Sequence, residues 1–89
     1  MIIIINGNNF NNIDGFYKEI ILNFAPSIDW EINLDSLHDI LYGGFGVFEY
    51  GEEITLKWEN YSKSKVELEE INDILEIIES CENIYLILN

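Results

Sequence analysis

The four isoleucines at residues 2–5 constrain the fold of this chain more than any other feature of its sequence. They form an uninterrupted β-branched run that ends at Asn6-Gly7, and such a run is typical of a strand buried on both faces of a parallel sheet. The run at residues 84–88 is apolar in the same way. Residues 53–58 alternate instead, as a half-buried strand does. We therefore expect three strands, the first of which lies in the interior of the sheet.

The first interval between these strands holds two stretches of helical periodicity. In residues 14–24 apolar side chains recur at helical spacing, and Asp14 is the expected N-cap. An irregular loop at residues 25–32 follows. Asn33 is a good N-cap for a short helix that runs to about Tyr42, and the glycines after it would end the helix.

The second interval also predicts helices. A helical turn or two is expected at residues 60–65, and a longer helix with an apolar inner face at about residues 67–81. Helices between successive strands imply parallel strands that are joined by right-handed crossovers. We therefore predict a single α/β domain over residues 1–89, with a three-stranded parallel sheet and about four helices.

The charge composition limits the partners of the chain. Seventeen Asp and Glu residues against four Lys give a net charge of −13. Phosphate backbones repel such a chain, so the composition excludes a nucleic-acid-binding function. The same field would steer the chain toward a basic protein partner. The alternative is that the acidity only keeps a small protein soluble.

The N-terminus and the cysteine count bear on localisation. The apolar residues at the N-terminus are too few for a secretory signal or a membrane span, and no basic residue precedes them. Cys81 is the only cysteine, so no internal disulfide is possible, which fits a reducing compartment. We expect a cytoplasmic protein that has no membrane partner.

Groups that could perform catalysis are few. Ser36, His38 and Asp39 are close in sequence, but on a helix such near neighbours point apart and form no triad among themselves. Cys81 lies beside apolar residues, where a packed structural thiol is the expectation. No phosphate loop, dinucleotide fingerprint or cluster of metal ligands is present. We expect neither an enzyme nor a cofactor or metal, and a small carboxylate-based hydrolase is the remaining enzymatic alternative.

The predicted helix at residues 33–42 has two contrasting faces. They are Leu34, Leu37 and Leu41 on the apolar side and Asp35, Asp39 and Tyr42 on the other, with His38 at the boundary. The positive N-terminal end of the helix favours Asp35, whereas Asp39 lies in mid-helix and is repelled by Asp35. A chain this acidic contains such pairs by chance, so a solvated face is the alternative to a binding surface.

Aromatic residues of the adjoining segments flank these carboxylates. They are Trp30, Tyr42, Phe45 and Phe48. Aromatic side chains around a charged centre are typical of interface hot spots. Core packing is the alternative interpretation, and it is the one that we expect for Phe48.

The helix and its flanks resemble a known family. The segment Asn33-Leu34-Asp35-Ser36-Leu37-His38-Asp39-Ile40-Leu41, followed by Tyr42-Gly43, resembles the N-L-D-A-L-x-D-x-L-x-G helix of the barstar family. Residues 4–7 are similar to the opening strand and turn of that family, residues 56–65 to its second strand and short helix, and residues 84–88 to its closing strand. The resemblance therefore covers nearly the whole chain and implies a barstar-like fold.

The resemblance also implies a function, because members of that family are intracellular inhibitors of basic secreted ribonucleases of the barnase type. Asp39 would project into the active site in place of a substrate phosphate, Asp35 would support it electrostatically, and Asn33 would order the start of the helix. The other residues of the implied contact surface are Asp29, Trp30, His38, Tyr42, Gly43, Gly44 and, from the last helix, Glu76 or Glu79.

Some positions depart from the family pattern. Asp29 stands where the family has an aromatic residue, Glu31 where it has glycine, and His38 where a bulky aromatic is common. The loop after Gly43 is also longer. Because these positions lie in the implied contact surface, the identity of the partner stays open. The alternative is a barstar-like immunity or regulatory module against a basic toxin that is not a ribonuclease.

Overall fold

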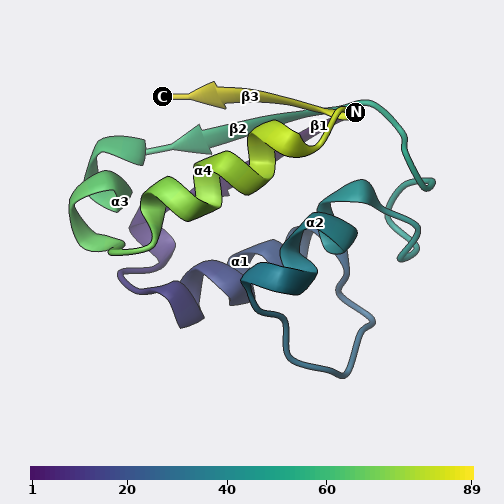
Figure 1. Cartoon of the computed structure of the whole chain (residues 1–89), viewed down its shortest axis with the longest axis horizontal. Coiled ribbons are helices and arrows are strands. Elements are labelled where there is room, and N and C mark those ends of the chain that lie inside the picture. Colours follow the sequence, from purple (N-terminus) through teal and green to yellow (C-terminus); the bar gives the residue numbers. More distant parts are fainter.

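A computed structural model describes all 89 residues, and three strands form one sheet in it (Figure 1). The strands are β1 (Ile2–Asn6), β2 (Ile54–Glu59) and β3 (Ile84–Leu88). They pair in the order β1-β2-β3, and both pairs are parallel. The helices are the 3-10 helix η1 (Gly7–Asn9) and the α-helices α1 (Ile13–Phe24), α2 (Leu34–Tyr42), α3 (Tyr61–Glu67) and α4 (Ile71–Ser80). The predicted α/β fold, with a three-stranded parallel sheet and four helices, is confirmed.

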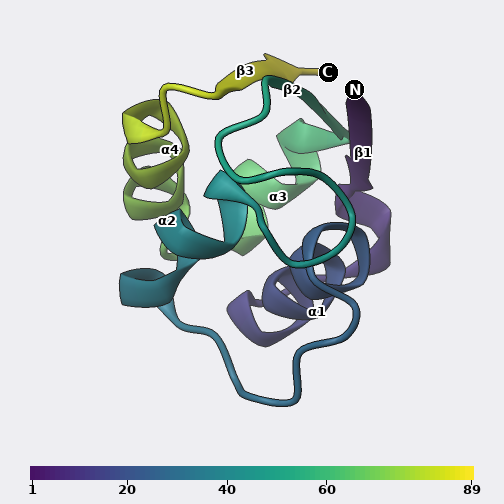
Figure 2. The same cartoon turned by 90° about the vertical axis from the view of Figure 1, so that its right-hand side faces the viewer.

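The helices cover one face of the sheet and leave the other open (Figures 1 and 2). On the open face the side chains of Ile2 and Ile4 are 61% and 49% exposed, and Tyr85 is exposed as well. The prediction of an interior first strand is therefore wrong: β1 is an edge strand, and only Ile3 and Ile5 face the core. Three strands leave one interior position, which β2 fills. Because strand side chains alternate between faces, the isoleucine run leaves half of its members on the open side.

Trp58 on β2 is the centre of the core between the sheet and the helices. Its ring is fully buried and stacks on Phe16 of α1, with 5.3 Å between the ring centroids. The indole Nε1–H donates a hydrogen bond to Ser64 Oγ of α3 at 3.1 Å, which satisfies the polar atom of a buried aromatic residue. Ile54 and Leu56 share the buried face of β2, so the predicted alternation of this strand is confirmed.

The carboxyl ends of the strands are closed by η1 and α3. Lys63 Nζ donates hydrogen bonds to the carbonyl oxygens of Gly7 at 3.1 Å and Phe10 at 3.0 Å, and it forms a salt bridge with Glu67. A Cβ atom on Gly7 would lie 2.5 Å from Ser64 Oγ, so the close approach of η1 to α3 requires glycine. The polar groups at this end are used in the fold itself.

Two helix starts differ from the prediction. The N-cap of α1 is Asn12, whose Oδ1 accepts a hydrogen bond from the Gly15 N–H at 2.9 Å, and Asp14 lies in the first turn instead. In the first turn, the positive end of the helix still stabilises the carboxylate of Asp14. Helix α4 begins at Ile71, later than predicted, because Leu68 has an extended backbone that ends α3. None of these helices has both the length and the apolar character that a membrane crossing demands.

Candidate partner-binding surface

The local sequence fixes both ends of α2. At its start the Ser36 N–H donates to Asn33 Oδ1 at 3.0 Å, and the Asn33 N–H donates to Ser36 Oγ at 2.9 Å, which completes a capping box. At its end Gly43 has a φ of +97° and lies beneath the ring of Phe48. The predicted N-cap and stop are confirmed. Because both ends are fixed, α2 is a rigid support for the side chains on its surface.

The two faces of α2 differ in burial as the stripe pattern predicts. Leu37 and Leu41 are fully buried and Leu34 is partly buried, whereas Asp35 and Asp39 are exposed. Neither carboxylate takes part in the hydrogen bonds or ion pairs of the fold. Both are therefore free to accept charge-assisted hydrogen bonds from outside the chain.

Charge is distributed unevenly around these carboxylates. Fourteen of the seventeen acidic residues lie in residues 29–53 and 67–82, and neither segment contains a Lys or an Arg. The two segments include α2 and α4, which pack against each other. Burial raises the pKa of Tyr17, which lies on α1, and nearby carboxylates, that of Glu70 foremost, raise it further. The side of the molecule that α2 and α4 form is thus strongly negative and would attract a basic protein.

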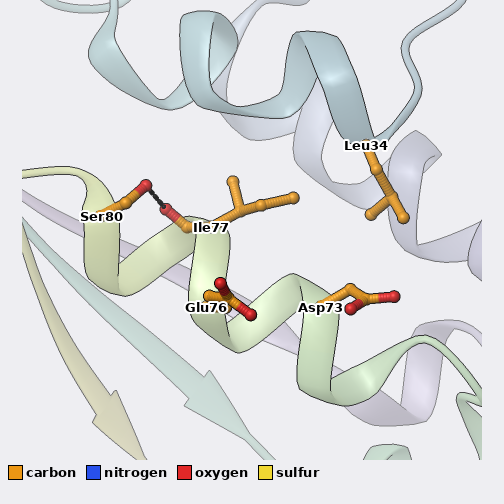
Figure 3. Close-up of a pocket in the computed structure, with 5 residues that line it drawn as sticks. All are labelled: Leu34, Asp73, Glu76, Ile77 and Ser80. Carbon is orange, nitrogen blue, oxygen red and sulfur yellow. Dashed lines mark hydrogen bonds between the residues drawn. The ribbon is translucent and has the colours of Figure 1, made fainter.

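A shallow groove of about 360 Å³ runs between α2 and α4 (Figure 3). Its lining residues are Leu34, Asp73, Glu76, Ile77 and Ser80. Leu34 points from the start of α2 toward α4. The structure thus brings Glu76, which the sequence assigned to the contact surface, to the same side of the molecule as the first turn of α2. Asp73 lies in this groove as well, and the sequence interpretation had not included it.

A second cavity, of about 320 Å³, lies beside the carboxyl-terminal half of α2. Its lining residues are His38, Asp39, Tyr42, Tyr50, Ser80 and Glu82. The His38 ring stacks on the Tyr42 ring with 6.0 Å between the centroids and 13° between the planes. The Tyr50 ring meets the Tyr42 ring edge-on at 4.6 Å. Sequence reasoning placed three of these residues at the site and missed Tyr50, Ser80 and Glu82, although the length of the loop that carries Tyr50 was a usable signal.

The remaining residues of the implied surface lie on two loops. Asp29 and Trp30 are exposed, and the Trp30 ring meets the Phe45 ring edge-on at 6.3 Å. This contact brings the loop before α2 and the loop after it together. Gly44 is exposed, but Gly43 is buried, so Gly43 shapes the surface through the backbone. The expectation that Phe48 belongs to the core is confirmed, since this side chain is buried and packs against Phe24.

No protein-family model matches this chain, and no curated protein matches its sequence. The structural evidence for the role of the surface is therefore its own residues and their geometry.

The environment of Cys81 does not favour nucleophilic chemistry at this surface. Cys81 is buried, and its Sγ–H donates to the Ile77 carbonyl oxygen at 3.4 Å. Burial raises the pKa of this thiol to about 11, although a hydrogen bond with Ser80 acts in the opposite direction, so the thiol is protonated at neutral pH. The expected structural role of Cys81 agrees with this environment. What the surface offers instead is a rigid set of unpaired carboxylates with aromatic neighbours, which is suited to binding.

Proposed function

We propose that this chain is an intracellular, stoichiometric inhibitor of a basic secreted microbial ribonuclease and that it blocks the active site of that enzyme with α2. One observation carries the proposal: Asp35 and Asp39 lie one turn apart on the exposed side of a capped helix, and no group of the chain pairs with them. Two like charges at this spacing disfavour the helix. A binding role explains why both are nevertheless kept unpaired.

The mechanism follows from the chemistry of a phosphate site. A ribonuclease binds the phosphate of RNA through groups such as Arg, Lys and protonated His. Asp39 supplies carboxylate oxygens to these groups from a rigid helix, so that little conformational entropy is lost on binding. Asp35 adds negative charge one turn away, and Glu76 extends the acidic surface onto α4. Inhibition is then competitive with RNA and needs one inhibitor for each enzyme.

The aromatic side chains complete this binding surface. Trp30 is 44% exposed although it packs edge-on against Phe45. An exposed tryptophan that a neighbour holds in place offers a large contact area at a low entropic cost, as interface anchors do. The two loops that carry these rings flank α2, so they would contact the partner around the central carboxylates.

Two further observations support an inhibitor that stays inside the producing cell. The resemblance of the chain to the barstar family, which is carried by Asn33, Asp35 and Asp39, implies this location and this role. Cys81 is a buried free thiol, which fits the reducing cytoplasm. Such a protein would protect the cell from its own ribonuclease before that enzyme is secreted.

The experiment that tests the proposal is a titration of basic, guanyl-specific microbial ribonucleases with the purified protein. We expect RNA cleavage to fall linearly with added protein and to reach zero at one inhibitor per enzyme. Higher RNA concentration should slow the onset of inhibition. Full RNA cleavage by every enzyme at a molar excess of the protein would contradict the proposal.

The second candidate function is that of an immunity or regulatory module against a basic toxin of another class. The observation in its favour is the set of departures at the contact surface, where Glu31 and His38 replace the residues typical of the family. Capture of a basic toxin without nuclease activity, combined with failure of the ribonuclease titration, would favour this candidate.

A further inference from the structure

The cavity beside the carboxyl-terminal half of α2 contains more than the carboxylate that the proposed function uses. Tyr50 comes from the loop after α2 and is 77% exposed, although it is a large aromatic residue. Its ring packs edge-on against Tyr42 at 4.6 Å, and Tyr42 is stacked in turn on His38. Glu82, from the turn between α4 and β3, lies in the same cavity as Asp39. Three separate segments thus contribute to one concave site.

The fold holds these segments together at a buried position. Asn83 is 6% exposed, and its Nδ2 donates hydrogen bonds to the Leu41 carbonyl oxygen at 3.1 Å and to the Glu52 carbonyl oxygen at 3.2 Å. One side chain therefore joins the end of α2, the loop after it and the start of β3. Because Asn83 directly follows Glu82, and Leu41 directly precedes Tyr42, this clamp fixes the positions of the cavity residues.

Two glycines of positive φ shape the loop beside the tyrosine rings. The Gly51 N–H donates to the Tyr42 carbonyl oxygen at 2.7 Å, and a Cβ atom on Gly51 would lie 3.3 Å from the Tyr42 ring. Gly44 lies beside Tyr50, and a Cβ atom there would make only an ordinary van der Waals contact with the Tyr50 Cβ, at 3.5 Å. Both glycines have a positive φ that other residues rarely adopt. The loop conformation is thus specific and presents Tyr50 beside Tyr42.

The carboxylates and aromatic rings of the cavity favour the binding of a planar cation. Two carboxylates attract positive charge, and no Lys or Arg contributes to the lining. Aromatic faces favour guanidinium over ammonium, because guanidinium is planar, weakly hydrated and able to stack. A nucleic acid base could also stack on tyrosine, but its phosphates would be repelled by the acidic surroundings.

We propose that this cavity is a second recognition subsite, which takes an arginine side chain of the partner protein against the exposed Tyr50 ring, beside Tyr42 and within reach of the carboxylates of Asp39 and Glu82. The inference rests on the function proposed above and adds to it the residue type that the partner must present next to its active site. Tyr50 and Glu82 then determine which basic proteins bind tightly. Partners that lack an arginine at this place would bind through the α2 carboxylates alone.

The test uses N-acetyl-arginine methylamide as a probe, with the lysine analogue as the comparison, in titrations followed by NMR of the folded protein. We expect saturable shifts at Tyr42, Tyr50 and Glu82, and an affinity for the arginine probe about fivefold above that for the lysine probe. Tyr50→Ala and Glu82→Gln should each weaken the arginine probe about two- to fivefold or more. Equal affinities for the two probes, shifts located elsewhere, or no effect of Tyr50→Ala would overturn the subsite.

Matched variants control for the loss of one tyrosine and one charge. Tyr85→Ala removes a tyrosine that is 69% exposed on the open face of the sheet, and Glu69→Gln removes an exposed acid outside the cavity. Neither change should alter binding of the probe. Because this titration contains no ribonuclease, its outcome is separate from that of the inhibition assay. Binding of arginine without ribonuclease inhibition would reject the proposed function and keep the subsite, and the reverse pair of results would reject the subsite alone.

Discussion

The charged groups Lys63 and Glu19 at one end of the sheet and Asp39 at the other differ in their partners within the chain. At the carboxyl ends of the strands, Lys63 is shared between two backbone carbonyls and Glu67. Glu19 accepts hydrogen bonds there from the Asn6 N–H at 2.9 Å and from Asn9 Nδ2 at 3.0 Å. At the amino ends, where α2 leads into β2 and α4 into β3, Asp39 has no such partner.

This difference separates the part of the molecule that maintains the fold from the part that we propose to bind a partner. Polar groups that serve stability are normally hydrogen-bonded within the chain. Parallel α/β sheets commonly bind ligands outside the carboxyl ends of their strands. Here that end is filled by η1 and α3, and the available carboxylates lie at the opposite end. Changes at the closed end should therefore affect stability, and changes at the acidic end should affect binding.

The largest expected effect of the closed end on stability comes from Gly7→Ala. The added Cβ atom would lie 2.5 Å from Ser64 Oγ and 2.6 Å from the Asn60 carbonyl oxygen. We expect the free energy of unfolding to fall by about 2–3 kcal/mol, measured by denaturant titration. Inhibition by the folded fraction should not change. Val66→Ala, at an 86% exposed position of the same end, is the control and should leave the midpoint unchanged or slightly higher, because alanine favours the helix. Loss of inhibition by the folded Gly7→Ala variant would contradict the conclusion that the closed end serves stability and not binding.

A smaller effect is expected from salt. Because fourteen of the seventeen acidic residues lie in residues 29–53 and 67–82, which contain no Lys or Arg, the association rate with a basic ribonuclease should fall about tenfold between low and physiological ionic strength. The dissociation rate should change less. Stopped-flow association kinetics measure both rates. An association rate that does not depend on salt would mean that the negative field does not steer binding.

The smallest expected effect comes from removing the N-cap of α2 or that of α1. Asn33→Ala removes the capping box of α2, and Asn12→Ala removes the side-chain cap of α1. Each change should lower the free energy of unfolding by about 1 kcal/mol. Only Asn33→Ala should also weaken inhibition, because α2 carries the contact residues. If both variants inhibit equally well, the order of the α2 start is irrelevant to binding.

The sequence predicted the elements well because their signals are local. Periodicity identified three strands and four helices, and Asn33 and the glycines after Tyr42 marked the ends of α2 correctly. The errors arose where local signals do not discriminate. Asn12 and Asp14 are both good N-cap residues, and the structure uses the first. An all-isoleucine strand has no alternation from which its exposed face could be recognised.

The site was predictable only in part, for a related reason. Asp35 and Asp39 could be placed on the exposed face of α2 because helical spacing alone decides it. Tyr50 and Glu82 reach the same cavity through contacts between segments far apart in sequence, which Asn83 holds together. Such contacts leave no periodic pattern. The glycine- and aromatic-rich loop after Gly43 was recognisable in the sequence, but its composition did not show which side chain it presents.

The most direct test of the account is the paired measurement of stability and inhibition for Asp39→Ala, with Glu69→Ala as the control of equal charge change. Asp39 is exposed, has no partner and is repelled by Asp35, so its removal should leave the denaturation midpoint unchanged or slightly higher. The inhibition constant should rise by the equivalent of about 2–5 kcal/mol, because basic groups of the ribonuclease would be left buried and unpaired. Asp39→Asn, which keeps the shape and removes the charge, should also bind poorly. A lower midpoint with unchanged inhibition would show that Asp39 is a structural residue and would contradict the account.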